Sequence, residues 1–253
     1  MDIIKTYYAG KTILYKRHSK GNYRKGGKHR KPTRPLSEKQ KKSNLNRAAF
    51  ECTKILNSNF NEDDYWFTLT YEESCFPEDL DAARGNLRKF LRSLRTIYKK
   101  SGGFIKYVCC TEFSEEGRLH HHMVISSLGG QIEAKAIEEK WRYGFCYSEN
   151  LYDQGNYADL AQYIVKKDYW EENGGVGKKW FASRNIERPE EEILEAPSMK
   201  VIPEITESPG YYVDPKTIRE GISAAGYLYQ SYIEVELPLG LNKNDIYGYV
   251  KND

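Results

Sequence analysis

The sequence predicts an α+β protein in which a central antiparallel sheet of about five strands is flanked by helices. Short runs rich in β-branched and aromatic residues occur at residues 65–71, 104–113 and 119–127. Longer segments between and around them repeat apolar residues at helical spacing. The last two runs are separated only by a polar turn that contains glycine, which is typical of an antiparallel hairpin.

The first half of the chain predicts three elements in order. A helix is expected from about residue 43, because apolar residues follow one helical stripe until Asn57 and Asn59 can end it. The apolar run 65–71 is expected to be a buried strand. A long amphipathic helix should cover residues 78–100, because acids lie at its start and bases at its end, as the helix dipole favours.

The second half predicts four further elements. The hairpin is followed by a helix over residues 131–142, a short strand at 145–148 and a helix over 156–169. The segment PEEEILEAP is acidic and flanked by prolines, so we expect a linker there. YLYQSYIEVELP (227–238) alternates strongly enough to predict a strand.

Composition limits the class of protein. The chain has 253 residues, of which 39% are hydrophobic, so a substantial core is expected. Its five cysteines show no CxxC spacing, which argues against a disulfide framework or a tetrahedral zinc site. No apolar run approaches the length of a membrane span, and MDIIKTYYAGK lacks the pattern of a secretory signal. We therefore expect a cytoplasmic protein with no membrane partner.

Charge is distributed unevenly along the chain. Residues 1–50 hold 15 Lys/Arg against 2 Asp/Glu, whereas the remainder holds 24 against 34. Residues 16–43 contain almost no aliphatic side chain, so we predict a flexible basic arm over 1–43, a folded domain over 44–189 and a C-terminal extension over 190–253. A basic arm on an acidic body predicts a nucleic-acid partner, although a solubilising tail is the alternative. The arm residues expected to contact DNA are Arg24, Lys25, Lys28, Arg30, Lys31 and Arg34.

The hairpin carries the first candidate site. Residues two apart on a strand share a face, so His120 and His122 present two imidazoles to one side and His121 faces the other. Glu112 ends the partner strand and should lie across the turn from them. Two histidines and one carboxylate suit a divalent cation that keeps positions open for substrate and water. Separately, each of these residues is compatible with an ordinary surface or core position.

A second candidate site lies on the late helix. Lys166 and Lys167 follow Tyr163 at three and four residues, so a lysine can share a face with the tyrosine hydroxyl. A phenol whose ordinary pKa is about 10 needs a nearby cation or base to act as a nucleophile. Most of the 21 tyrosines are expected to be packing or surface residues. Only the combination with the histidine hairpin distinguishes Tyr163.

Three ordered motifs resemble the HUH single-stranded-DNA endonucleases, specifically the replication initiators of small plasmids and phages. They are FTLTY (67–71), LHHHM (119–123) with His121 in the hydrophobic slot, and YIVK (163–166). The flanking segments WRYGF (141–145) and KKWFASRNIERP (178–189) are also similar to those of such initiators. The resemblance covers roughly residues 44–189.

The resemblance implies an activity and roles for individual residues. Glu112, His120 and His122 would hold Mg²⁺ or Mn²⁺, Tyr163 would be the nucleophile, and Lys166 would assist at the phosphate or the metal water. The reaction would nick single-stranded DNA at a replication origin, leaving a 5′-phosphotyrosine and a free 3′-hydroxyl for rolling-circle replication. The implied partners are origin DNA, a host helicase and a host DNA polymerase. Further DNA contacts are expected at Thr68, Thr70 and Lys167.

Some features of the sequence limit or depart from this interpretation. No nucleotide cofactor is expected, because around GGVGKKW (174–180) Glu172 replaces the first glycine of a phosphate loop and Lys179 its Ser or Thr. Asp159 stands four residues before Tyr163, where some phage initiators carry a second tyrosine, so a single-tyrosine enzyme is expected. The alternatives are a transposase or relaxase of the same class, or a non-catalytic RRM-like nucleic-acid-binding module.

Overall fold

The computed structural model describes residues 1–21, 37–152, 155–166, 179–223, 225–243 and 245–246. The chain divides into two compact units. The central unit comprises Ser43–Asp153 and Tyr157–Glu187, and the terminal unit comprises Met1–Lys42, Gln154–Asn156 and Arg188–Asp253.

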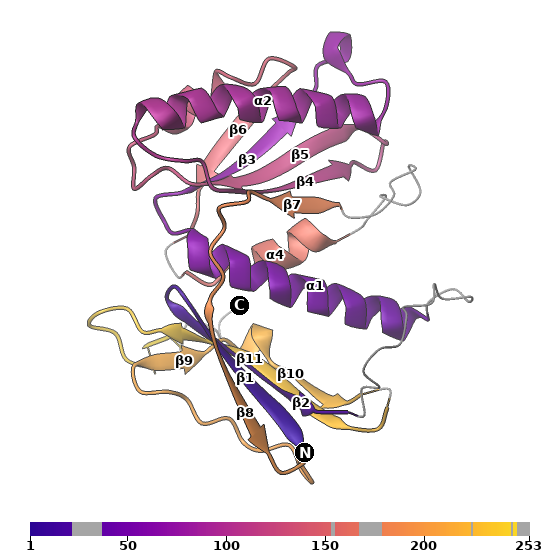
Figure 1. Ribbon diagram of the computed structural model, residues 1–253, viewed down its shortest axis with the longest axis vertical. Helices are drawn as coiled ribbons and strands as arrows, with labels where there is room; N and C mark the ends of the chain where they lie inside the picture. Colours follow the sequence, from indigo (N-terminus) through magenta and orange to yellow (C-terminus); the bar gives the residue numbers. More distant parts are fainter. Residues whose placement is uncertain (22–36, 153–154, 167–178, 224, 244, 247–253) are drawn as a thin grey trace. The chain divides into compact units, whose positions relative to one another are not determined.

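The central unit contains a five-stranded sheet in which all neighbouring strands are antiparallel. Its helices lie on the faces of this sheet (Figure 1). The predicted α+β class, with an antiparallel sheet of about five strands flanked by helices, is confirmed. The strand order is β6 (Cys146–Asn150), β3 (Tyr65–Thr70), β5 (Leu119–Ile125), β4 (Tyr107–Phe113) and β7 (Trp180–Ala182).

One face of this sheet is covered by α2 (Leu80–Lys100), which runs across the strands (Figure 1). The helix begins where the Asp79 side chain accepts a hydrogen bond from the backbone N–H of Ala82, and it ends with two lysines that complement the helix dipole. Its apolar stripe packs against the inward side chains of alternate strand positions in one core cluster. The fully buried members include Phe67, Leu69, Leu87, Leu94 and Met123.

The opposite face is covered by α1 (Glu38–Asn59) and α4 (Ala158–Val165), which form a second core cluster with it. Val108, Cys110 and Val124 supply the sheet side of this cluster. Both helices lie on the side of the sheet away from α2 (Figure 1). The two faces are therefore built from alternating residues of the same strands, as a sheet between two apolar layers requires.

Two helices of the central unit are shorter than predicted. The helix predicted over 131–142 is only α3 (Ala134–Glu138), because the chain must turn back to place Trp141 in the α2-side core before entering β6. The helix predicted to reach residue 169 ends at Val165, and Lys166 already has an extended ψ of 137°. Residues 167–169 lie outside the described part of the chain. The remaining short helix is η1 (Glu73–Cys75).

The terminal unit corrects two predictions. Residues 2–19 are not a flexible arm, because β1 (Asp2–Ala9) and β2 (Thr12–Ser19) form a hairpin around Gly10, which has a φ of 56°. PEEEILEAP is not a linker, because β8 (Glu190–Ala196) pairs with β1. The acidic strand β8 depends on a partner, β1, that is distant in sequence, whereas the β1–β2 hairpin is local and was obscured by the basic composition of the segment.

The rest of the terminal unit completes a six-stranded sheet. β11 (Leu228–Glu236) pairs with β2, which confirms the strand predicted at 227–238. β10 (Arg219–Ile222) and β9 (Tyr211–Val213) pair with β11, and η2 (Pro215–Thr217) lies between them in sequence. Among the described residues, no helix is long and apolar enough to cross a membrane.

The buried stripe of α2 yields a prediction about stability. Leu94→Ala should lower the free energy of unfolding by about 2–5 kcal/mol, because Leu94 is completely buried and a cavity would remain. Arg92→Ala, on the exposed side of the same helix, should change it by less than about 0.5 kcal/mol. Urea unfolding followed by circular dichroism compares the two variants, and equal effects would contradict the assigned packing.

Candidate metal centre and tyrosine nucleophile

The strand register brings the predicted ligands onto one face of the sheet. In the β4–β5 pair Glu112 lies opposite His120, and Cys110 lies opposite His122. Directly paired residues share a face, and residues two apart on a strand do as well. Glu112, His120 and His122 therefore project together from the face that α1 and α4 cover.

These three side chains form a cluster that could hold a metal ion. The Glu112 Oε2 atom lies 3.8 Å from His120 Nε2 and 3.6 Å from His122 Nε2, and the candidate ligand atoms all lie within 4.8 Å of one another. Within the described residues, Glu112 Oε2 is buried and accepts no hydrogen bond. A buried carboxylate oxygen without a partner is costly unless a cation satisfies it, so this donor set fits a divalent ion.

His122 is held in the form that a metal ligand requires. Its Nδ1 atom is 3.0 Å from the Thr68 hydroxyl, and its ring stacks on Trp66 at 5.0 Å. Burial, reinforced by the neighbouring His120, lowers the pKa of His122 to about 3. The imidazole is therefore neutral near pH 7, and the bond at Nδ1 leaves Nε2 directed toward Glu112.

His121 belongs to the opposite face, as the strand alternation predicts. It is fully buried, with Nε2 2.8 Å from the Tyr71 hydroxyl and Nδ1 2.9 Å from the Thr111 hydroxyl. Burial lowers its pKa to about 3. Both ring nitrogens are thus occupied inside the α2-side core, and His121 takes no part in the cluster.

Tyr163 places its hydroxyl beside the candidate ligands. The Tyr163 Oη atom lies 3.0 Å from His122 Nε2, while 42% of the residue remains exposed. Burial of the hydroxyl, followed by the negative charge of Glu112, raises the pKa of this tyrosine above its ordinary value. The phenol is therefore protonated at neutral pH, and its use as a nucleophile requires added positive charge nearby.

Lys179, which spacing in the sequence does not single out, contacts this cluster. Lys166 directly follows α4, its backbone N–H still donates to the Gln162 carbonyl at 3.0 Å, and its side chain is exposed, so its assistance at the phosphate or the metal water stays a prediction. Lys167 lies outside the described residues. Lys179 is buried, its Nζ lies 3.1 Å from Glu112 Oε1, and it also donates to the Lys166 carbonyl.

Lys179 could not have been singled out from spacing. It lies directly before β7, whose pairing with β4 brings it alongside Glu112. Its only signal in the sequence was its place in the KKW segment that resembles the initiators. A lysine before an edge strand is otherwise an ordinary surface residue.

The structure describes only some of the residues that we expect to contact DNA. Thr68 is bonded to His122, and the Thr70 hydroxyl donates to the Phe145 carbonyl at 3.2 Å, so both already have structural partners. Contact of either threonine with DNA stays a prediction. The six arm residues Arg24, Lys25, Lys28, Arg30, Lys31 and Arg34 lie outside the described part of the chain.

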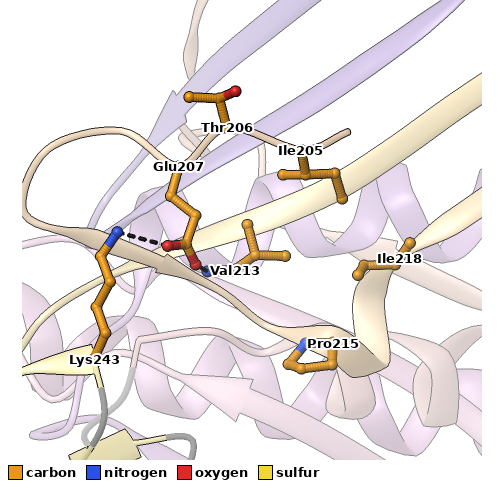
Figure 2. Close-up of a pocket in the computed structure, with 7 residues that line it drawn as sticks. All are labelled: Ile205, Thr206, Glu207, Val213, Pro215, Ile218 and Lys243. Carbon is orange, nitrogen blue, oxygen red and sulfur yellow. Dashed lines mark hydrogen bonds and ion pairs between the residues drawn. The ribbon is translucent and has the colours of Figure 1, made fainter. Parts of the chain in front are cut away.

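A separate hollow occurs in the terminal unit, and it shares no residue with the metal cluster (Figure 2). Its polar feature is Glu207, which accepts hydrogen bonds from Lys243 Nζ at 2.5 Å and from the Val213 backbone at 2.9 Å. These groups satisfy one another. The hollow therefore offers no chemistry comparable to that of the cluster.

Comparison with known proteins gives a match to a protein-family model. A family model for replication-associated proteins of the ORF2 type matches residues 64–168, a span that contains Glu112, His120, His122 and Tyr163. No curated protein and no solved structure matches the chain. The match supports a replication initiator of the Rep type, and the cluster fits a metal-dependent nuclease.

The cluster yields a prediction about metal binding. Glu112→Gln and His122→Ala should each weaken Mn²⁺ binding by about 10–100-fold or more, since each removes a ligand from the set. Isothermal titration calorimetry would measure this. His18→Ala removes a histidine of the terminal unit and should leave the affinity unchanged. Wild-type affinity in the His122 variant would exclude this ligand set.

Lys179 yields a second prediction. Lys179→Met should destabilise the metal-free protein by about 3–5 kcal/mol, because Glu112 would be left buried without a cation. Added Mn²⁺ should recover part of this loss by supplying positive charge, so the metal-dependent rise in Tm should exceed that of the wild type. Lys179→Arg keeps the charge and serves as the control. An equal metal response in all three proteins would contradict the electrostatic role.

Proposed function

We propose that this protein is a replication-initiator endonuclease that nicks single-stranded origin DNA by tyrosine transesterification. The observation that carries the proposal is the 3.0 Å approach of the Tyr163 hydroxyl to His122 Nε2, at a cluster of two histidines and a buried carboxylate. The family match supports a role in replication, and the arrangement of groups supports the nicking chemistry.

Each group at the site has a place in the proposed reaction. A divalent cation held by Glu112, His120 and His122 would supply Lewis-acid polarisation of the scissile phosphate. Tyr163 Oη attacks the phosphorus as the phenol loses its proton, which forms a phosphotyrosine bond. The bond from phosphorus to the 3′ oxygen breaks, and that oxygen gains a proton to become the free 3′-hydroxyl. The rigid helix and sheet would hold the attacking oxygen in position.

The charge at the site would keep the Tyr163 hydroxyl unreactive in the absence of substrate and ion. Glu112 and burial both raise the pKa of Tyr163, so little phenolate exists at neutral pH. Positive charge bound at the cluster would offset Glu112 and stabilise charge that develops on the attacking and phosphate oxygens. Attack would thus depend on ion binding.

The 3′-hydroxyl would prime a host DNA polymerase while a host helicase separates the strands, since no phosphate loop was found in the sequence. The first motif would contribute Thr68 and Thr70 close to the bound strand. The basic segment with Arg24 to Arg34 would contact the DNA backbone, and its affinity should fall as salt rises.

The nucleophile can be tested by trapping the covalent product. Tyr163→Phe removes one oxygen and should abolish the adduct with an origin-like single-stranded oligonucleotide in Mn²⁺, while Mn²⁺ binding and folding persist. Tyr152→Phe is the matched control, because Tyr152 is also 42% exposed. Denaturing gels and peptide mass spectrometry should place the nucleotide on Tyr163. An adduct on another tyrosine would overturn the assignment, and DNA binding without any adduct would favour the non-catalytic module.

A further inference from the structure

One edge strand of the sheet that carries the candidate metal ligands bears two exposed aromatic rings. Phe145, directly before β6, is 77% exposed, and Tyr147 within β6 is 64% exposed. β6 forms one edge of the central sheet (Figure 1). Large aromatic side chains so exposed and so close together mark a surface that binds something.

Both rings lie on the face of the sheet that carries the cluster. Tyr147 pairs with Thr68, and Thr68 pairs on its other side with His122. Phe145 accepts a hydrogen bond from the Thr70 backbone at 2.9 Å, and Thr70 pairs with His120. Phe145 and Tyr147 are thus each in line with one candidate histidine ligand.

The residue between them confirms this orientation. Cys146 packs against the core on the α2 side, and the Ser148 hydroxyl donates to Glu138 at 2.6 Å on that side. Strand alternation then directs Phe145 and Tyr147 to the opposite face.

Gly144 keeps Phe145 in this register. A Cβ atom at position 144 would lie 2.4 Å from the Glu72 backbone nitrogen and 2.5 Å from the Thr70 carbonyl oxygen. Only glycine allows this approach. Trp141 fixes the same segment, because its Nε1 donates to the Thr70 carbonyl at 2.8 Å. These contacts therefore fix the exposed Phe145 ring next to Thr70, the residue that pairs with His120.

We propose that Phe145 and Tyr147 form a stacking platform for two successive bases of the single strand at the cluster. This inference rests on the proposed function, since it names the surface that holds that substrate. The two residues are about 7 Å apart along β6, and β6 lies about 10 Å from the histidine strand β5, with β3 between them. That spacing is about twice the 3.4 Å rise of stacked bases, so each base of a stretched strand would have its own ring.

The chemistry of the surface favours bases as its ligand. Exposed aromatic rings at the edge of a sheet stack on bases of any sequence, because every base has a π face. Phe145 offers no polar group, so it would recognise the face of a base rather than its edge. The platform would orient the strand without selecting its sequence.

The test separates stacking from contact with the backbone. Binding of a fluorescent oligothymidylate and of an abasic oligonucleotide of equal length is measured by anisotropy in EDTA, using the full chain with Tyr163→Phe. In this background Phe145→Ala with Tyr147→Ala should lower affinity for oligothymidylate by at least about 30-fold and leave abasic binding unchanged. Phe145→Trp with Tyr147→Trp should retain the affinity.

The matched control removes two exposed rings elsewhere. Phe104 and Tyr227 are 80% and 50% exposed, and their double alanine variant should bind both oligonucleotides like the parent. An equal loss of affinity for the abasic oligonucleotide would overturn the platform, and so would unchanged affinity for both oligonucleotides. Unchanged affinity would instead favour a protein partner for the two rings. If the wild type forms no adduct but ring-dependent binding persists, the proposed nicking fails and the platform stands.

Discussion

The site depends on the pairing register of β4, β5 and β3. Because side chains alternate between the faces of a sheet, a slip of one residue in β5 would turn His120 and His122 into the α2-side core and bring His121 to the cluster. The apolar layers oppose such a slip. Phe67 and Met123 are buried with α2 on one side, and Val108 and Val124 are buried with α1 and α4 on the other. The packing of both layers therefore fixes which imidazoles can act as ligands.

The same register creates an electrostatic problem that the fold only partly solves. It buries the Glu112 carboxylate beside the imidazoles of His120 and His122, where an unpaired charge would be very costly. Lys179 offsets one oxygen with an ammonium group, and the second oxygen has no hydrogen-bond partner among the described residues. The metal-free cluster is thus balanced in charge but incomplete in its contacts. Such a site is prepared for a cation at the cost of local stability, as functional sites often are.

The features that could be predicted from the sequence are those that depend on residues close to one another in the chain. The hairpin, the long amphipathic helix and the face shared by His120 and His122 depend on local periodicity, and the structure has all three. The β1–β2 hairpin, which has apolar residues such as Ile3, Ile4, Ile13 and Leu14, was missed because the basic composition of residues 1–50 favoured a flexible arm. β8 was missed because its partner β1 is distant in the sequence. Lys179 was missed for a similar reason, since only the pairing of β7 with β4 brings it to Glu112.

The early end of α4 gives Lys179 a second connection. A helix C-terminus carries partial negative charge on carbonyl groups that no longer find partners within the helix. The Lys179 ammonium donates to the Lys166 carbonyl at that end and also pairs with Glu112. One buried side chain thus connects the helix that carries Tyr163 to the strand that carries a candidate metal ligand. Both contacts share one ammonium group. A shift of Glu112 toward a bound cation would therefore weaken the Glu112–Lys179 ion pair and strengthen the hydrogen bond from Lys179 to the C-terminal end of α4. The position of Tyr163 would then be coupled to occupation of the cluster through a residue that need not touch the substrate.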